Sequence, residues 1–252
     1  MKIAIVTGAS SGMGREMVKQ IGDRFGGIRE IWVIARRGER LRELESQIPV
    51  PLRILPLDLT EREDLERLEQ ELRREQPKVY ILANAAGFGK IAPAEQVSLE
   101  DEAGMIDVNC RALCAVTHLV LPYMAEGGRI LQFASAAAFL PQPGFAVYAA
   151  TKSFVLSYSR ALNGELKPRG ICVTAVCPGP VDTEFFQVAE TGGAMPAYKR
   201  YFMARPEKVA AQAMRDSMMG KAVSVYGLSM KGFFLLTKVI PHSLLLKILE
   251  QL

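Results

Sequence analysis

Residue types that would indicate metal or redox chemistry are scarce in this 252-residue chain. It contains four cysteines and two histidines, and Cys110, Cys114, Cys172 and Cys177 lack the spacing of a metal-binding finger. We therefore expect no metal site, and we interpret Cys110 and Cys114, one helical turn apart, as small buried hydrophobic residues. We identify no secretory leader, so we expect a reduced, cytoplasmic protein.

Concentrated charge is missing as well. The formal net charge is only +4, and the densest basic pairs, Arg36-Arg37 and Arg73-Arg74, have no interleaved aromatic residues, so no nucleic-acid partner is expected. We find no Ser/Gly/Pro-rich linker, low-complexity run or internal repeat. We therefore predict one domain over residues 1–252.

Short apolar runs rich in β-branched residues alternate with longer amphipathic segments. The predicted strands are Ile3–Val6, Ile31–Ala35, Leu52–Leu57, Val79–Ala83, Ile130–Phe133, Ile171–Val176 and Ala222–Tyr226. The predicted helices are Gly12–Phe25, Gly38–Gln47, Glu61–Glu75, Ala103–Met124, Tyr148–Lys167 and Pro206–Met218. Because continuous apolar runs are typical of parallel strands covered on both faces, we predict an α/β, Rossmann-type, doubly wound parallel sheet of about seven strands. Ligands of such sheets bind at the carboxyl ends of the strands.

A glycine-rich turn joins the first predicted strand to the first predicted helix. Gly8 permits a tight turn, Gly12 lets the backbone approach a pyrophosphate, and Gly14 brings the helix close to the strand. The helix N-terminus offers free N–H groups and a partial positive charge to phosphates. The residues predicted to bind a dinucleotide here are Gly8, Ser10, Ser11, Gly12, Met13 and Gly14, in a spacing wider than the usual fingerprint.

The end of the second predicted strand indicates which dinucleotide binds. NAD sites usually present a carboxylate there to the ribose 2′-hydroxyl, whereas NADP sites present a cation to the 2′-phosphate. Here Ala35 is followed by Arg36 and Arg37, and no acid comes before Glu39. Arginine suits phosphate, so NADP(H) is favoured over NAD(H). The alternative is that both arginines are solvated at the start of a helix.

Tyr148 and Lys152 are four residues apart and share one face of a predicted helix. Ketone reduction needs a proton on the developing alkoxide, and the tyrosine pKa of about 10 is too high for efficient transfer near neutral pH. A neighbouring ammonium, together with the charge of an oxidised nicotinamide, favours the phenolate and lowers that pKa. Ser135, at the end of the fifth predicted strand, could hold the substrate oxygen, or it could cap a helix or turn.

In their order along roughly residues 1–185, these motifs resemble the short-chain dehydrogenase/reductase family in its single-domain form. The matching segments are Thr7–Gly14, Asp58-Leu59, Asn84–Gly87, Asn109, Ser135, Tyr148–Lys152 and Pro178–Thr183. The resemblance implies that Tyr148 is the general acid/base, and that Lys152 tunes it and binds the nicotinamide ribose. It also implies that Ser135 positions the carbonyl and that Asn109 orders a water linking Lys152 to solvent.

The resemblance implies further cofactor contacts. They fall on Asp58, Leu59, Asn84, Ala85, Ala86, Gly87, Pro178, Gly179, Val181 and Thr183. Asp58 and Leu59 would lie near the adenine, while Thr183 and the Val181 backbone would hold the nicotinamide carboxamide. The family commonly has two asparagines where this chain has Asn84 and Ala85, and Ala85 cannot make that side-chain contact.

The resemblance implies a mobile substrate lid over residues 184–205, within a predicted substrate-lid region over residues 184–220. Gly192-Gly193 would let this lid hinge. Its apolar side chains suit either helix packing or a pocket wall; they are Phe185, Phe186, Met195, Tyr198, Tyr201, Phe202 and Met203.

An apolar tail is predicted over residues 230–252. It is too short, and too interrupted by Pro241 and several lysines, to span a bilayer. Three interpretations stay open: a dimer or core-packing helix, a cover over an apolar pocket, and an interfacial membrane anchor whose Lys231, Lys238 and Lys247 suit an anionic surface. The resemblance also implies a homodimer or homotetramer, paired through Ala103–Met124 and Tyr148–Lys167.

Together these features predict an NADP(H)-dependent oxidoreductase that interconverts an apolar ketone or aldehyde and an alcohol. The alternative is a catalytically idle cofactor-binding sensor or scaffold, which would need only the glycine-rich cradle and not Asn109, Ser135, Tyr148 and Lys152. A serine hydrolase is disfavoured, because the two histidines, His118 and His242, are expected on helix surfaces and not as catalytic bases.

Overall fold

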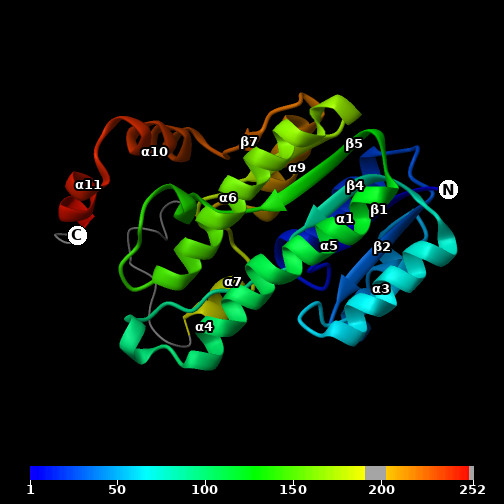
Figure 1. The fold of residues 1–252 in the computed structure, drawn as a ribbon, viewed down its shortest axis with the longest axis horizontal. Coiled ribbons are helices and arrows are strands. Elements are labelled where there is room, and N and C mark those ends of the chain that lie inside the picture. The colour runs from blue at the N-terminus through cyan, green and yellow to red at the C-terminus, as the bar shows by residue number, and fades with distance from the viewer. Residues whose placement is uncertain (191–202, 250–252) are drawn as a thin grey trace.

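The computed structural model describes residues 1–190 and 203–249, and it has a seven-stranded sheet at its centre (Figure 1). The strands are β1 Lys2–Thr7, β2 Glu30–Ala35, β3 Leu52–Pro56, β4 Lys78–Asn84, β5 Met124–Phe133, β6 Cys172–Val176 and β7 Val223–Ser224. Their order is β3-β2-β1-β4-β5-β6-β7, and every pair is parallel. Strands β2 and β3 are thus added on one side of β1, and β4 to β7 on the other. Ligands of such sheets bind at the point between β1 and β4 where this order reverses.

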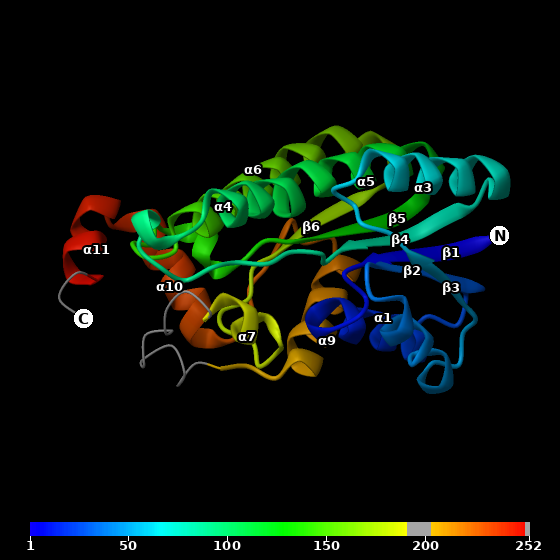
Figure 2. The ribbon, with the colours of Figure 1, turned by 90° about the horizontal axis from the view of Figure 1, so that it is seen from below.

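Helices cover both faces of the sheet, as predicted for a doubly wound fold (Figure 2). Helices α3 (Arg62–Glu75), α5 (Leu113–Val120) and α6 (Ala146–Leu166) lie over one face, where Leu68, Val116 and Leu162 pack on apolar strand residues. Helices α1 (Gly12–Arg24) and α9 (Pro206–Met218) lie over the other face. The remaining α-helices in the described ranges are α2 Gly38–Arg42, α4 Leu99–Ile106, α7 Phe185–Ala189, α10 Leu228–Val239 and α11 His242–Leu249. Burial on both faces explains why the strands are apolar along their whole length.

The predicted helix Ala103–Met124 differs most from the structure. It begins earlier, at Leu99, because the Ser98 side chain accepts a hydrogen bond from the Asp101 N–H at 3.0 Å and caps the first turn. A π-helical segment, Asp107–Ala112, then separates α4 from α5. Such segments are uncommon and frequently mark functional sites, and this one contains Asn109.

Within the described ranges, one continuous helical stretch, Leu99–Tyr123, is long and apolar enough to span a membrane by length and composition. Its residues Leu113, Val116 and Val120 are buried inside the protein, so here it forms part of the core.

Other boundaries shift by smaller amounts. The predicted helix Gly38–Gln47 divides into α2 and a 3₁₀ turn at Glu45–Gln47, and β7 is shorter than its predicted range. Strand β5 begins at Met124, six residues before the predicted Ile130. The tail forms two helices, because α10 ends at Val239 and α11 begins at His242 after Pro241. The α/β fold class itself is confirmed, whereas the division into lid and tail regions stays a prediction.

Candidate active site

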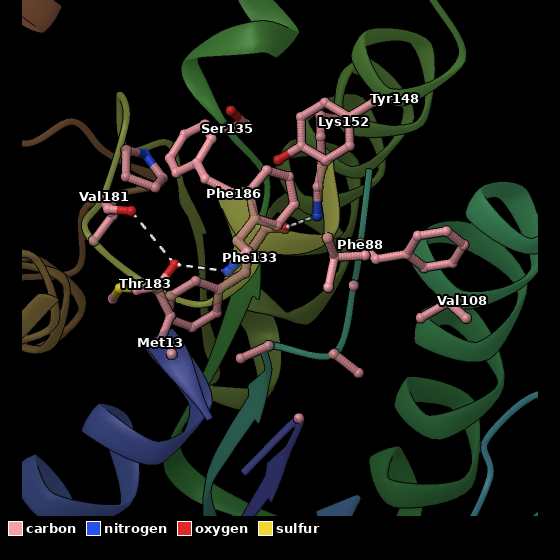
Figure 3. A pocket seen from close by; sticks show the side chains of 18 of the residues that line it. Met13, Phe88, Val108, Phe133, Ser135, Tyr148, Lys152, Val181, Thr183 and Phe186 are labelled. Carbon is pink, nitrogen blue, oxygen red and sulfur yellow. Dashed lines mark hydrogen bonds between the residues drawn. The ribbon is translucent and has the colours of Figure 1, made fainter. Parts of the chain in front are cut away.

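A cavity of about 1150 Å³ lies at the carboxyl ends of the strands. Segments that follow β1 through β6 line it, and they include every predicted site residue except Gly14, Asn84 and Asn109. Figure 3 shows Ser135, Tyr148 and Lys152 together in one part of the cavity, with Met13 and Thr183 in another. The fold therefore brings together predicted site residues from Gly8 to Thr183, which are 175 positions apart in the sequence.

The glycine-rich turn packs directly against the end of β4. Gly8 has a φ of +66°, and a Cβ there would lie 2.8 Å from the Ala85 carbonyl oxygen. A Cβ at Gly14 would collide with the Gly8 carbonyl, so Gly14 supports the turn from behind. The Ser11 side chain makes no capping hydrogen bond at the start of α1. The first-turn N–H groups of α1 are thus available to an anion in the cavity.

The two predicted phosphate-binding arginines have different surroundings. Arg37 donates to the Ser10 hydroxyl at 3.2 Å and to the Ser11 hydroxyl at 2.9 Å, which fixes its guanidinium beside the glycine-rich turn. Arg36 lies 3.7 Å from Asp58, and its side chain is 78% exposed, as expected if it were solvated. Burial alone would raise the pKa of Asp58, but hydrogen bonds from Thr60 and the charge of Arg36 together lower it.

Tyr148 and Lys152 are both buried on α6, one turn apart. The Tyr148 ring stacks on Phe145 at a centroid distance of 4.2 Å. The Lys152 Nζ donates to the Phe133 carbonyl at the end of β5 at 2.8 Å and lies 5.5 Å from the centroid of the Tyr148 ring (Figure 3). A buried ammonium is therefore held between a backbone oxygen and the face of the tyrosine.

Burial shifts the pKa values of this pair in opposite directions. It raises the pKa of Tyr148 to about 12, although a hydrogen bond with Ser135 acts the other way. It lowers the pKa of Lys152 to about 8, although Cys110 and Cys177 act to raise it. Burial is thus the larger effect on the Tyr148 pKa, and the lowering predicted from Lys152 together with the charge of an oxidised nicotinamide stays a prediction. Near pH 7 the tyrosine keeps its proton and most of the lysine is charged.

Asn109 connects the segment after β4 to α6. Its Oδ1 accepts from the Phe88 N–H at 3.1 Å, and its Nδ2 donates to the Phe88 carbonyl at 2.9 Å and to the Thr151 hydroxyl at 3.0 Å. Gly87 fits between the two elements, because a Cβ there would lie 2.8 Å from Asn109 Oδ1 and 3.3 Å from Lys152 Nζ. Asn109 therefore braces the wall behind Lys152, and its predicted role in ordering a water stays a prediction.

Asn84 faces the core and not the cavity. Its Nδ2 donates to the Thr117 hydroxyl and to Gln132 Oε1, each at 3.0 Å, and the residue is 2% exposed. Asn84 does not line the cavity, and its predicted contact with the cofactor stays a prediction. The polar side chain instead joins the end of β4 to β5 and α5.

A family model described as short chain dehydrogenase matches residues 2–192 of this chain. The chain belongs to the short-chain dehydrogenase family. A sulfoacetaldehyde reductase of Chromohalobacter salexigens is 36% identical over 76% of this chain and 77% of its own length. The NADP-dependent 3-hydroxy acid dehydrogenase YdfG of Escherichia coli is 33% identical over 90% and 94% of the two chains.

Solved structures of other short-chain dehydrogenases have the same architecture. One from Sphingobium yanoikuyae, in complex with NADPH, superimposes with a TM-score of 0.78 at 28% identity, covering 96% of this chain and 97% of that one. A serine dehydrogenase in its closed form with NADP⁺ gives 0.78 at 32% identity, covering 89% and 94%.

A β-bridge joins the chain at the two ends of the predicted lid. Val181 pairs with Ala204 in a β-bridge, and the Ala204 N–H donates to the Pro180 carbonyl at 2.9 Å. Beyond the bridge, the ring of Phe185 lies 5.3 Å from that of Tyr148, centroid to centroid. The predicted hinge Gly192-Gly193 and the side chains of Met195, Tyr198, Tyr201 and Phe202 lie outside the described residues.

Helix α10 of the tail forms part of the cavity wall. Met230 and Phe233 line the cavity, and Phe234 packs on Phe139 at a centroid distance of 4.6 Å. The contacts on the inner face of α10 are consistent with two of the interpretations of the tail, a core-packing helix and a cover over an apolar pocket. Its outer face leaves Leu228 86% exposed and Val239 74% exposed.

Several residues of the site were not found from the sequence. Phe145 precedes Tyr148 by three positions, so helical spacing could have indicated it. Thr151 and the Phe133 carbonyl become visible only once α6 is placed over β5. Glu184, which binds Arg37 and Arg40 across 147 and 144 residues, had no local signal.

The space at Gly87 can be tested by substitution. Gly87→Ala should lower dehydrogenase kcat by about 10- to 100-fold, because the added methyl group displaces Asn109 or Lys152 by a fraction of an ångström or more. Gly164→Ala is the matched control: it lies on the same helix as Lys152, and a Cβ there meets nothing within 4 Å. The control should keep its kcat, measured in the same assay. An unchanged kcat in Gly87→Ala would contradict the close packing inferred for this wall.

Proposed function

We propose that this short-chain dehydrogenase is an NADP(H)-dependent oxidoreductase that interconverts an apolar ketone or aldehyde and the corresponding alcohol. The observation that carries the proposal is the buried Tyr148–Lys152 pair on the wall that also holds Ser135. Burying an ammonium and a phenol is unfavourable unless both have partners, and a protein that only bound the cofactor would not need a buried phenol beside Lys152. This argues against the alternative of an idle sensor or scaffold.

The cofactor fits the cradle as the chain builds it. Gly8, Gly12 and the first turn of α1 leave room and N–H groups for a pyrophosphate, and Arg37 with the Ser10 and Ser11 hydroxyls suits a ribose 2′-phosphate. The E. coli relative is named as NADP-dependent, and the two structural neighbours described above contain NADPH and NADP⁺. When bound, the cofactor supplies or accepts the hydride.

The side chains supply the proton. With a pKa of about 12, Tyr148 keeps its proton at neutral pH and can donate it to a carbonyl oxygen held by the Ser135 hydroxyl. The phenolate that remains is stabilised by the Lys152 ammonium, which is charged below its pKa of about 8. Asn109 acts as a positioning residue through Phe88 and Thr151. This is the protonation state that reduction of a carbonyl requires.

The cavity wall supports an apolar substrate. Aromatic and thioether side chains line the cavity; they are Phe145, Phe185, Phe186, Met230 and Phe233. Lys90 also lines the cavity, but its ammonium lies 3.6 Å from the Asp101 carboxylate, so its charge is compensated. The relatives are named for sulfoacetaldehyde, 3-hydroxy acids and serine, which are polar, so we propose that the wall sets a different preference here.

Assembly as a homodimer or homotetramer, cytoplasmic location and membrane contact by the tail stay predictions. The outer face of α10 carries the exposed residues Leu228, Leu235 and Val239, which suit either a second copy of the chain or a membrane surface.

The proton-transfer role is tested by removing one hydroxyl. Tyr148→Phe should lower kcat by at least about 100-fold and leave the Kd for NADPH nearly unchanged, because the ring stays and only the acid is lost. Tyr158→Phe, the same change on the same helix, should retain activity. NADPH consumption with a panel of ketones and fluorescence titration of NADPH measure the two quantities. Retained turnover in Tyr148→Phe would refute the mechanism.

The cofactor preference is tested with a double substitution. Arg36→Ala with Arg37→Ala should raise the Kd for NADPH by about 10-fold or more and hardly change that for NADH, because only NADPH has the 2′-phosphate. The control is Arg73→Ala with Arg74→Ala on α3, where both arginines are largely exposed. Fluorescence titrations give all four affinities. Equal losses for both cofactors would count against a phosphate contact.

The substrate class is tested at α10. Phe233→Ala should raise the KM of long-chain ketones by about threefold to 30-fold, in keeping with the loss of a few buried methylene contacts, and leave short ketones unaffected. Leu235→Ala, on the exposed face of the same helix, should leave both unchanged. Turnover across ketones of increasing chain length is the measurement. If kcat/KM does not improve with chain length in the unaltered protein, the apolar assignment fails.

A further inference from the structure

Glu184 places a carboxylate inside the arginine cluster next to the glycine-rich turn. Its Oε2 lies 3.3 Å from Arg37 Nη1, and both of its carboxylate oxygens accept from Arg40 Nη1 at 2.7 Å. Glu184 directly follows Thr183 and lines the same cavity as Arg36 and Arg37. One acidic side chain therefore joins the segment after β6 to the segment after β2.

This carboxylate uses a cation that the proposed cofactor also needs. The Nε and Nη2 atoms of Arg37 are directed to Ser10 and Ser11, which leaves Nη1 facing Glu184. A 2′-phosphate held by Arg37 and the two serine hydroxyls would bring a second anion against that guanidinium. Hydrogen bonding to Arg40 is the largest of the effects that together lower the pKa of Glu184, so its carboxylate is ionised at neutral pH.

We propose that Glu184 is a specificity-determining residue, whose carboxylate competes with the ribose 2′-phosphate for Arg37 and is held back from full competition by Arg40. The inference rests on the proposed function, because it takes the 2′-phosphate to bind at Arg37. Its physical basis is that two like charges sharing one cation weaken each other's binding. Glu184 thereby moderates the discrimination between NADPH and NADH that Arg37 provides.

Competition for Arg37 and a purely structural role of Glu184 predict opposite changes in the affinity for NADPH when Glu184 is replaced. If Glu184 only fastened the segment after β6 over the cofactor, breaking its ion pairs from either side would weaken both NADPH and NADH. Competition instead predicts opposite results from the two sides. Loss of the carboxylate should strengthen NADPH binding, whereas loss of Arg40 should leave Glu184 to Arg37 alone and weaken NADPH binding.

The experiment is a set of fluorescence titrations of NADPH and NADH with three variants. Glu184→Gln should lower the Kd for NADPH by about three- to tenfold and leave the Kd for NADH unchanged, a size suited to a partly exposed pair. Arg40→Gln should raise the Kd for NADPH. Glu43→Gln, an exposed position at the end of α2, is the control and should change neither. Titration with 2′,5′-ADP and 5′-AMP repeats the comparison without the nicotinamide.

Each result decides the question. Weaker binding of both cofactors in Glu184→Gln, or an unchanged ratio of the two Kd values, would overturn the role of Glu184. If the unaltered protein prefers NADPH while Glu184→Gln leaves the ratio unchanged, only this inference fails. If the unaltered protein binds NADH at least as tightly as NADPH, and 5′-AMP as tightly as 2′,5′-ADP, the proposed cofactor preference fails and the inference fails with it.

Discussion

The hydrogen bond from the Lys152 ammonium to the Phe133 carbonyl is the contact on which the rest of the site depends. A charged group that is 5% exposed needs strong partners, and this one has a backbone oxygen and the Tyr148 ring. To supply these partners, α6 must cross the end of β5 in one register. The segment after β4 must also have a glycine at position 87, because a Cβ there would lie 3.3 Å from Lys152 Nζ. The brace formed by Asn109 then keeps these elements together.

The location of this contact follows from the sheet. Because the strand order reverses between β1 and β4, the segments after these two strands diverge and leave space at the carboxyl edge. The glycine-rich turn occupies one side of that space, and the buried pair on α6 occupies the other. Phosphate-binding and proton-transferring groups thus belong to different crossovers, so each can vary without the other.

The sequence was informative where chemistry depends on local spacing. The turn from Gly8 to Gly14 and the pair Tyr148–Lys152 lie within single strand-to-helix units, so their geometry follows from helical periodicity and turn sterics. All seven strands were found for the same reason, since their apolar runs are short and well separated. The π-helical segment around Asn109 and the core-facing side chain of Asn84 depend on packing between elements, and no local pattern encodes them. The pairing of Arg40 with Glu184 required the full fold.

The β-bridge between Val181 and Ala204 has an evolutionary consequence. Since the two ends of the intervening chain are already joined, its closure entropy changes only slowly with length, by about 0.6 kcal/mol for each doubling. Changes in chain length between the two bridge residues would leave β6 and α9 in place. The bridge therefore lets the length of this stretch change during evolution while the sheet and α9 keep their positions.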